Sequence, residues 1–215
     1  MTVEFSEFLP EVLPFAPGVA EPVAENAIRQ ACIEFCERTD YWTETLDPMP
    51  SIDGVARYDI FPPNNYSRIH NVLRVSYNDK ELTPKTPTEL DLLLYNWETT
   101  ESTPSYYYVD RDKDIKIVLA YVPDTTANDY IDIRVSLKPK VSGDRVADEI
   151  YLDWRKSVSY GALAFLFRIP NKPWSDEGKG MMYYRQFNAS VVDANRRARK
   201  AFTYREEFIP MRPWK

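Results

Sequence analysis

The chain has 215 residues, enough for one domain with a substantial core, or for two if one is inserted into the other. Hydrophobic residues make up 44% and charged residues 28%, so the composition is that of a globular protein and argues against disorder or low-complexity sequence. Lys and Arg number 27 against 33 Asp and Glu, and the resulting net charge of −6 disfavours DNA or RNA capture through phosphate neutralisation.

Cysteine content and hydropathy indicate where such a chain resides. Cys32 and Cys36 are too few for a disulfide scaffold, so we expect a reducing compartment, the cytoplasm by default. The longest purely apolar run, Ala162–Phe167, is far shorter than the roughly 20 residues of a membrane span. The first residues are acidic rather than basic, so neither a signal peptide nor a membrane anchor is expected.

Two compositional biases point to function. The chain has only 6 Gly but 17 Pro, so the connections between elements are expected to be stiff. Flexible glycine-rich loops that bind phosphate are therefore not expected. Aromatic residues reach 14%, with 15 Tyr, a content that suits surfaces that bind other proteins, although a core can also absorb many rings.

The first part of the chain predicts helices. Over Pro22–Arg38, apolar residues recur at steps of three and four with charged residues opposite, which predicts an amphipathic helix. Ahead of it, Phe5–Phe15 predicts one short helix that ends where Pro14 and Pro17 interrupt the pattern.

After Pro50 the hydrophobic period changes to two, which predicts half-buried strands. In one of them Ile69, Leu73, Val75 and Tyr77 are expected to face the core. Polar residues on the opposite face favour antiparallel pairing. The expected strands are Ala56–Ile60, Ile69–Tyr77, Glu81–Leu82, Ser105–Val109, Ile115–Tyr121 and Tyr130–Lys138.

A short helix is expected among these strands. Thr86 suits the N-cap position, Pro87 the first turn, and Glu89 the acidic position of a capping box. These residues predict a helix over Thr88–Tyr95.

Helical periodicity returns after Gly143. One stripe carries Ile150, Trp154, Val158, Gly161, Ala162, Phe165 and Ile169, and Pro170 ends that helix. The last helix is predicted over Asp176–Phe202, with a packing seam at Tyr184, Phe187, Val191, Ala194, Ala198 and Ala201. Tyr204–Lys215 lacks periodicity and predicts an extended tail.

The order of elements predicts an α+β fold, because strands and helices do not alternate as a parallel sheet requires. Residues 1–47 and 141–202 are expected to form a helical bundle, residues 48–140 an inserted antiparallel β domain, and residues 203–215 an extended tail.

Catalytic and metal-binding motifs are weak. His70 is the only histidine and stands on the polar face of a strand without a nucleophile motif, so we expect a structural role. Cys32 and Cys36 share a helix face but lack partners for a zinc site, and buried thiols are expected. We therefore expect no enzyme, no metal and no cofactor.

Two glycine- and aspartate-containing segments resemble ligand loops only in part. Asp110, Asp112 and Asp114 have the first spacings of a calcium loop, but its glycine and terminal glutamate are missing, so a charged hairpin tip is expected. Gly178 and Gly180 flank Lys179 without the spacing of a phosphate loop.

A basic run and an aromatic tail close the chain. Arg196, Arg197, Arg199 and Lys200 either bind nucleic acid or an acidic partner, or form a solvated helix end that complements the helix dipole. The hydrophobic pattern gives no core position to three aromatic residues of the tail, Tyr204, Phe208 and Trp214. If they are exposed, they would form a surface that binds other proteins.

Three segments resemble head-to-tail connector (adaptor) proteins of tailed bacteriophages. The first is Asp148–Phe187, with Tyr160-Gly161-Ala162-Leu163 and Ile169-Pro170-Asn171-Lys172-Pro173-Trp174. The others are Ala31–Asp47, where a helix is followed by Trp42, and Thr86–Tyr108, where Thr-Pro-x-Glu-Leu-Asp precedes Trp97.

The resemblance implies a structural virion protein of the neck, synthesised in the bacterial host cytoplasm. It implies a homo-oligomeric ring of about twelve copies that joins the portal protein to the tail nozzle or tube. The genome would pass through the pore without specific DNA binding. In that role the portal-binding residues are expected to be Arg196, Arg197, Arg199, Lys200, Tyr204, Phe208 and Trp214.

Two alternatives stay open. A hydrolase of cell-wall or capsular glycans would use carboxylates of the β segment. A carbohydrate-binding module would use Tyr106, Tyr107 and Tyr108 as a stacking face, against which ordinary strand packing has to be weighed.

Overall fold

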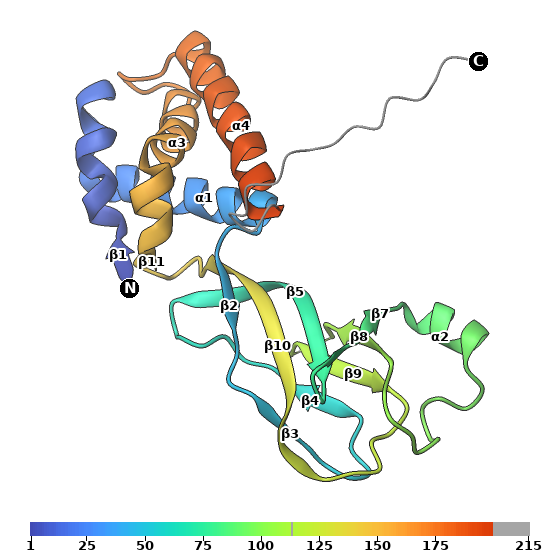
Figure 1. Ribbon diagram of the computed structural model, residues 1–215. Coiled ribbons are helices and arrows are strands. Elements are labelled where there is room, and N and C mark those ends of the chain that lie inside the picture. The colour runs from blue at the N-terminus through green and yellow to red at the C-terminus, as the bar shows by residue number, and fades with distance from the viewer. Residues whose placement is uncertain (113, 200–215) are drawn as a thin grey trace, which may run out of the picture.

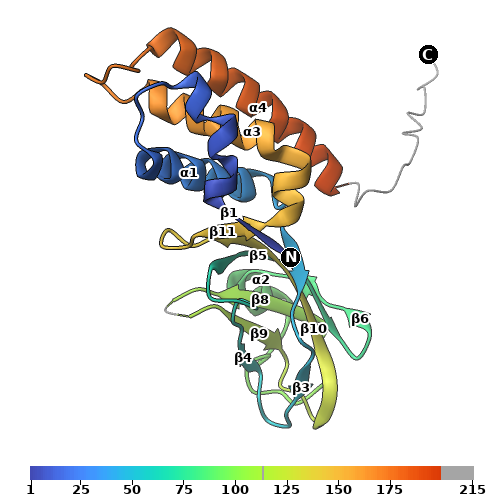
Figure 2. The same cartoon turned by 90° about the vertical axis from the view of Figure 1, so that its left-hand side faces the viewer.

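Three long helices gather at one end of the computed structural model and the strands fill the other (Figures 1 and 2). The structure describes residues 1–112 and 114–199. Within them it is a mixture of helices and mostly antiparallel sheets, as the α+β prediction requires. The helices are α1 (Glu21–Thr39), α3 (Asp148–Phe167) and α4 (Glu177–Arg199).

Each of these helices contacts the other two, because each has an apolar stripe to bury. In α1 the stripe is the predicted one, and the side chains from Ala24 to Cys36 on that face are buried. In α3 the predicted stripe is wrong at Phe165, which is 39% exposed, whereas Leu166 is fully buried. Ile169, also predicted in the stripe, lies after the helix end at Phe167 and is partly buried. In α4 the seam residues Phe187, Val191 and Ala194 are buried, while Ala201 and the predicted end at Phe202 lie outside the described residues.

The first residues do not form the single helix predicted over Phe5–Phe15. They form strand β1 (Thr2–Glu4), followed by the 3-10 helices η1 (Phe5–Glu11) and η2 (Leu13–Phe15). Pro10 lies inside η1 and has no backbone N–H to donate, which favours short 3-10 turns over a continuous α-helix. β1 pairs antiparallel with β11 (Arg145–Ala147), so the N-terminus is held beside the start of α3.

The strands form two larger sheets. The first contains β2 (Thr43–Thr45), β3 (Met49–Ser51), β5 (Ser67–Tyr77), β6 (Lys80–Glu81) and β10 (Ala127–Pro139). The second contains β4 (Arg57–Asp59), β7 (Thr83–Pro84), β8 (Tyr106–Asp110) and β9 (Lys116–Ala120). Antiparallel pairing is confirmed except between β7 and β8, which pair in parallel through a connection that contains α2 (Pro87–Leu93).

Strand β5 departs from simple alternation. Its pairing with β10 shifts between Arg134 and Val135 and again between Ser136 and Leu137, so Leu73 and His70 are the extra residues of two bulges. Val72 takes the place opposite Val135, and Leu73 is 41% exposed. The prediction that Leu73 faces the core is therefore wrong, because a bulge moves the following residues to the other face.

The core is continuous from the helices into the sheets. Buried side chains of α1, α3 and α4 belong to one hydrophobic cluster with those of β5, β9 and β10. At the joint, the Asp40 carboxylate accepts hydrogen bonds from the Ser136 hydroxyl and from Asn71 Nδ2. A second, small cluster, made of Leu90, Trp97, Val118 and Ala120, lies under α2.

Candidate interaction surfaces

The predicted portal-binding residues fall at the end of α4. Arg196 is exposed, and Arg197 pairs with Asp193 at 3.1 Å while its guanidinium lies 5.0 Å from the Trp154 ring. Arg199 ends α4, but its side chain lies outside the described residues, as do Lys200, Tyr204, Phe208 and Trp214. The structure thus places two of the seven predicted side chains, and both lie on the outer surface of the helical end.

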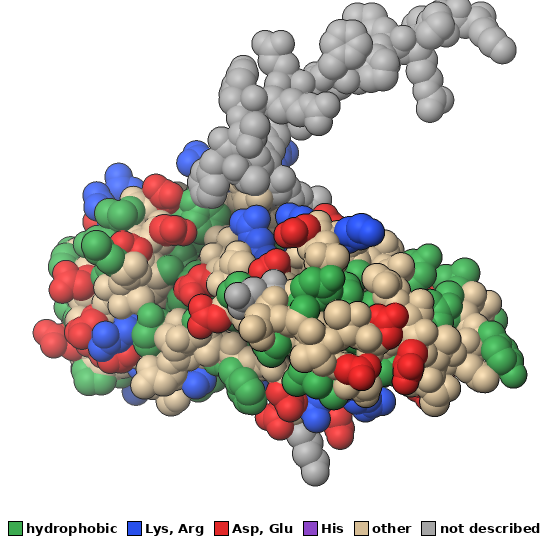
Figure 3. Space-filling view, turned by 60° about the horizontal axis from the view of Figure 1, so that its bottom comes forward, with side chains coloured by type: hydrophobic (Ala, Val, Ile, Leu, Met, Phe, Trp, Pro, Cys, Tyr) green, Lys and Arg blue, Asp and Glu red, His purple; other side chains and the backbone are tan. Residues whose placement is uncertain are grey.

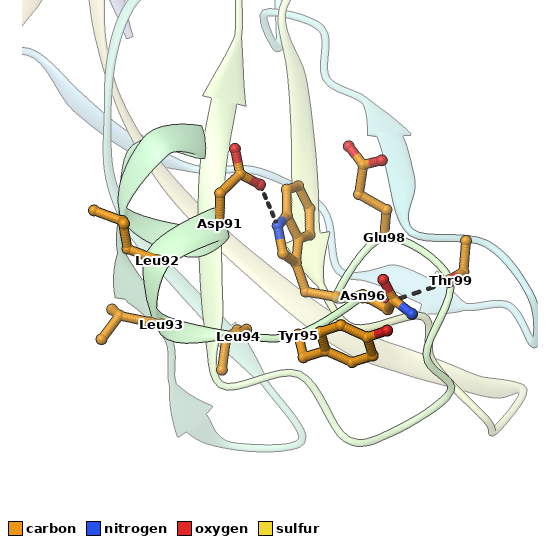
Figure 4. Close-up of a pocket in the computed structure, with 9 residues that line it drawn as sticks. Asp91, Leu92, Leu93, Leu94, Tyr95, Asn96, Glu98 and Thr99 are labelled. Carbon is orange, nitrogen blue, oxygen red and sulfur yellow. Dashed lines mark hydrogen bonds between the residues drawn. The ribbon is translucent and has the colours of Figure 1, made fainter.

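A second surface, which was not among the predicted binding residues, lies at the tip of α2, in the chain from Leu92 to Tyr95. Leu92, Leu93 and Tyr95 are 83%, 58% and 87% exposed. In Figure 4 Leu92 and Leu93 point away from the sheet, and Figure 3 shows hydrophobic side chains at the right-hand end of the face, where α2 lies. The sequence signal was the run Leu92–Tyr95, four apolar residues in succession of which a short helix can bury only part.

The segment from Thr86 to Trp97, which forms this tip, is held in place by polar contacts at both of its ends. Thr86 and Glu89 form the predicted capping box, in which the Glu89 carboxylate accepts from the Thr86 backbone N–H at 2.8 Å. That hydrogen bond lowers the pKa of Glu89. At the other end of the tip Trp97 Nε1 donates to Asp91 at 2.9 Å, and residues 91–99 line a hollow of about 600 Å³.

A third surface is a groove between η2, α3 and α4, with a volume of about 360 Å³. Its apolar lining includes Phe15 and Met182, which are 56% and 45% exposed. Its floor is aromatic, since the rings of Tyr160 and Tyr183 stack with centroids 5.9 Å apart. Sequence periodicity could not reveal this groove, because its walls come from three separate segments.

The residues considered for chemistry have structural partners. His70 Nε2 lies 3.1 Å from the Glu37 carbonyl oxygen, which ties β5 to α1. Cys32 and Cys36 are fully buried, and burial raises the pKa of both thiols. Across residues 1–112 and 114–199, no three His, Cys, Asp or Glu side chains come together in a way that could hold a metal ion.

The three aspartates near residue 112 lie where the hairpin prediction put them. They are at and after the end of β8, before the chain turns into β9. Asp110 Oδ1 accepts the backbone N–H of Asp112 at 3.2 Å, a bond within the turn. Their arrangement is that of a charged hairpin tip.

The tyrosines of the predicted stacking face lie on two faces of β8. Tyr107 is 3% exposed and belongs to the main core, while Tyr106 and Tyr108 pack on the small cluster under α2. The Tyr108 ring meets that of Trp97 edge-on at 6.0 Å. Strand alternation therefore separates them, and the three rings do not form the shared platform that a carbohydrate-binding face would need.

None of the helices in the described part of the chain is both long and apolar enough to cross a membrane.

The chain matches a known family. The family model described as SU10 adaptor protein matches residues 4–206, a range that includes all the described helices. No curated protein matches the chain. The family match confirms the resemblance to adaptor proteins that was predicted from the sequence.

Proposed function

Since the chain belongs to the SU10 adaptor protein family, we propose that it is a structural protein of the phage neck that joins the portal protein to the tail. In this role it forms a homo-oligomeric ring of about twelve copies through which the genome passes without specific contacts. The observation that carries the proposal is the family match over residues 4–206. The role requires no catalysis and no cofactor.

We assign a separate task to each part of the chain. The helical bundle of residues 1–47 and 141–202 forms the body of the ring, and the inserted segment 48–140 offers the tail its attachment surface. The end of α4 and the tail of residues 203–215 bind the portal. The exposed Arg196 supports this assignment, because an unburied cation at a helix end is available to an acidic partner surface.

Deletion of Tyr204–Lys215 tests the portal contact. We expect loss of binding to purified portal in a pull-down, with a thermal unfolding midpoint close to that of the full chain. Binding that survives the deletion would overturn the docking role of the tail.

The basic helix end is tested separately by Arg196→Glu. We expect weaker portal binding, with a decrease that is largest at low ionic strength because the contact is electrostatic. Lys172→Glu is the matched control, since Lys172 is also exposed and lies in the loop before α4, near its other end. Equal effects of the two substitutions would show that net charge, and not the helix end, governs binding.

A further inference from the structure

The tip of α2 is a built projection and not a frayed end. Leu90 anchors the helix in the small cluster at 0% exposure, and the capping box and the Trp97–Asp91 bond fix both ends of the segment. Three large apolar side chains, Leu92, Leu93 and Tyr95, are nevertheless left in solvent. We call these three residues the knob. A rigid apolar projection loses little conformational entropy when a partner covers it.

The groove is a concave surface with a largely apolar lining. The six residues that form most of its wall are Phe15, Lys156, Tyr160, Leu163, Met182 and Tyr183. Glu11 also lines it and forms an ion pair with Arg155 at 3.5 Å. Leu152, 67% exposed, lies one turn before Lys156 on α3 and extends the apolar surface beyond the groove.

The charges around the two surfaces are opposite. The segment 86–101, which carries the knob, contains four acidic residues and no Lys or Arg. Lys85, just before it, pairs with Glu89 at 3.6 Å, which leaves Asp91, Glu98 and Glu101 without an ion pair among the described residues. On α4 Lys179 and Arg185 lie three residues before and after Met182. Lys179 pairs with Asp176 at 3.5 Å, whereas Arg185 is exposed and forms no ion pair with other described residues. Lys156, which lines the groove, is exposed and makes no ion pair with other described residues. Contact between the acidic surface around the knob and the basic surface around the groove would favour association and fix its orientation.

One molecule cannot place its knob in its own groove. In Figure 1 α2 lies at the right-hand side of the sheet end, whereas the N-terminal segment that contributes Phe15 lies at the left of the helical end. In Figure 2 α2 lies among the strands of the sheet end, below the helical end that holds the N-terminal segment. A knob that fills this groove therefore has to come from another chain.

We propose that the knob of one copy of this chain inserts into the groove of the next copy. Two unlike patches that meet in this way form a heterologous contact, the kind that repeats around a ring and closes it. The inference rests on the proposed function, because it names the surfaces by which ring neighbours bind one another.

Site-directed cross-linking between two populations of the full-length chain tests the contact. One population carries Leu93→Cys and the other Met182→Cys, and they are mixed at high concentration, with and without portal, and treated with a short bismaleimide. We expect a cross-linked dimer in this mixture. The native Cys32 and Cys36 are fully buried and should not react.

The matched control replaces Met182→Cys with Val192→Cys. Val192 is on the same helix and has a similar exposure, 51% against 45%, but does not line the groove. At least a tenfold lower yield of dimer is expected in this mixture. Equal yields in the two mixtures, or no dimer in either, would overturn the pairing of knob and groove.

Electron microscopy of portal complexes in the same samples separates this inference from the proposed function. If rings form on the portal but the Leu93→Cys and Met182→Cys mixture gives no specific dimer, the pairing is wrong and the adaptor role stands. If the chain neither binds portal nor forms rings, the proposed function fails as well.

Discussion

Gly161 lies on α3 at the point where α1 and α4 both approach it closely. A Cβ at this position would lie 2.9 Å from Ala31 Cβ on α1 and 3.0 Å from the Phe187 ring on α4. Neither neighbour is the free end of a flexible side chain. The absence of a side chain on α3 therefore allows α1 and α4 to approach it closely.

Gly161→Ala is expected to destabilise the protein. Overpacking costs about 1 to 3 kcal/mol, and the gain in helix propensity offsets at most about 1 kcal/mol of it. The free energy of unfolding, measured by urea titration, should fall by about 1 to 2 kcal/mol.

Gly178→Ala is the control for that substitution. Gly178 is also in a helix, but its added Cβ would meet only Asp176 Oδ1 at an ordinary 3.4 Å. This variant should be as stable as the parent chain or slightly more stable. A Gly161→Ala chain that unfolds at the same urea concentration as the parent would contradict the packing argument.

Helix α2 and strand β5 show how far local sequence predicts an element. The capping box of α2 needs only residues three apart, so Thr86 and Glu89 were enough to predict where the helix starts. The bulges of β5 depend on its pairing with β10, sixty residues later in the chain, and alternation alone assigned Leu73 to the wrong face. The start of α2 was thus predicted from local sequence, although its end is at Leu93 and not at the predicted Tyr95, whereas the register of β5 depends on its partner strand.

Thr86→Ala is expected to loosen α2. Loss of an N-cap costs about 1 kcal/mol, so the α2 amides should exchange with solvent about fivefold faster. Because hydrogen bonding lowers the pKa of Glu89, the same amides should also lose protection as the pH falls through that lowered pKa and the carboxylate is protonated.

Hydrogen exchange followed by mass spectrometry measures both effects. Thr88→Ala is the control, because Thr88 is an exposed residue of the same helix outside the capping box. Similar exchange in the two variants would show that the box does not hold the tip.

At the scale of the whole molecule, the helical and sheet ends share one core. The Trp42 carbonyl accepts from the Leu137 N–H at 2.8 Å, and Leu46 N–H donates to the Ile133 carbonyl at 2.9 Å, so β10 is bonded to the chain that leaves α1. Tyr41, Trp42 and Leu46 are all buried in the main cluster. Because the inserted segment shares this core and these hydrogen bonds with the helical end, unfolding of one part would expose buried surface of the other.

We expect the protein to unfold in a single cooperative transition. In a urea series, helical ellipticity and the hydrogen exchange of peptides from β8 and β9 should give the same midpoint, as two-state unfolding requires. Two separate midpoints would show instead that residues 48–140 fold as an independent domain.

The sequence by itself determined the helices α1, α3 and α4, the short helix α2 with its cap, and the antiparallel character of the strands. It did so because hydrophobic period and capping are properties of neighbouring residues. Only the tertiary structure decided that Leu73 and Phe165 are exposed, and that Phe15, Tyr160 and Met182 meet in a groove. Those outcomes depend on bulges and on contacts between distant segments, for which a local pattern carries no signal.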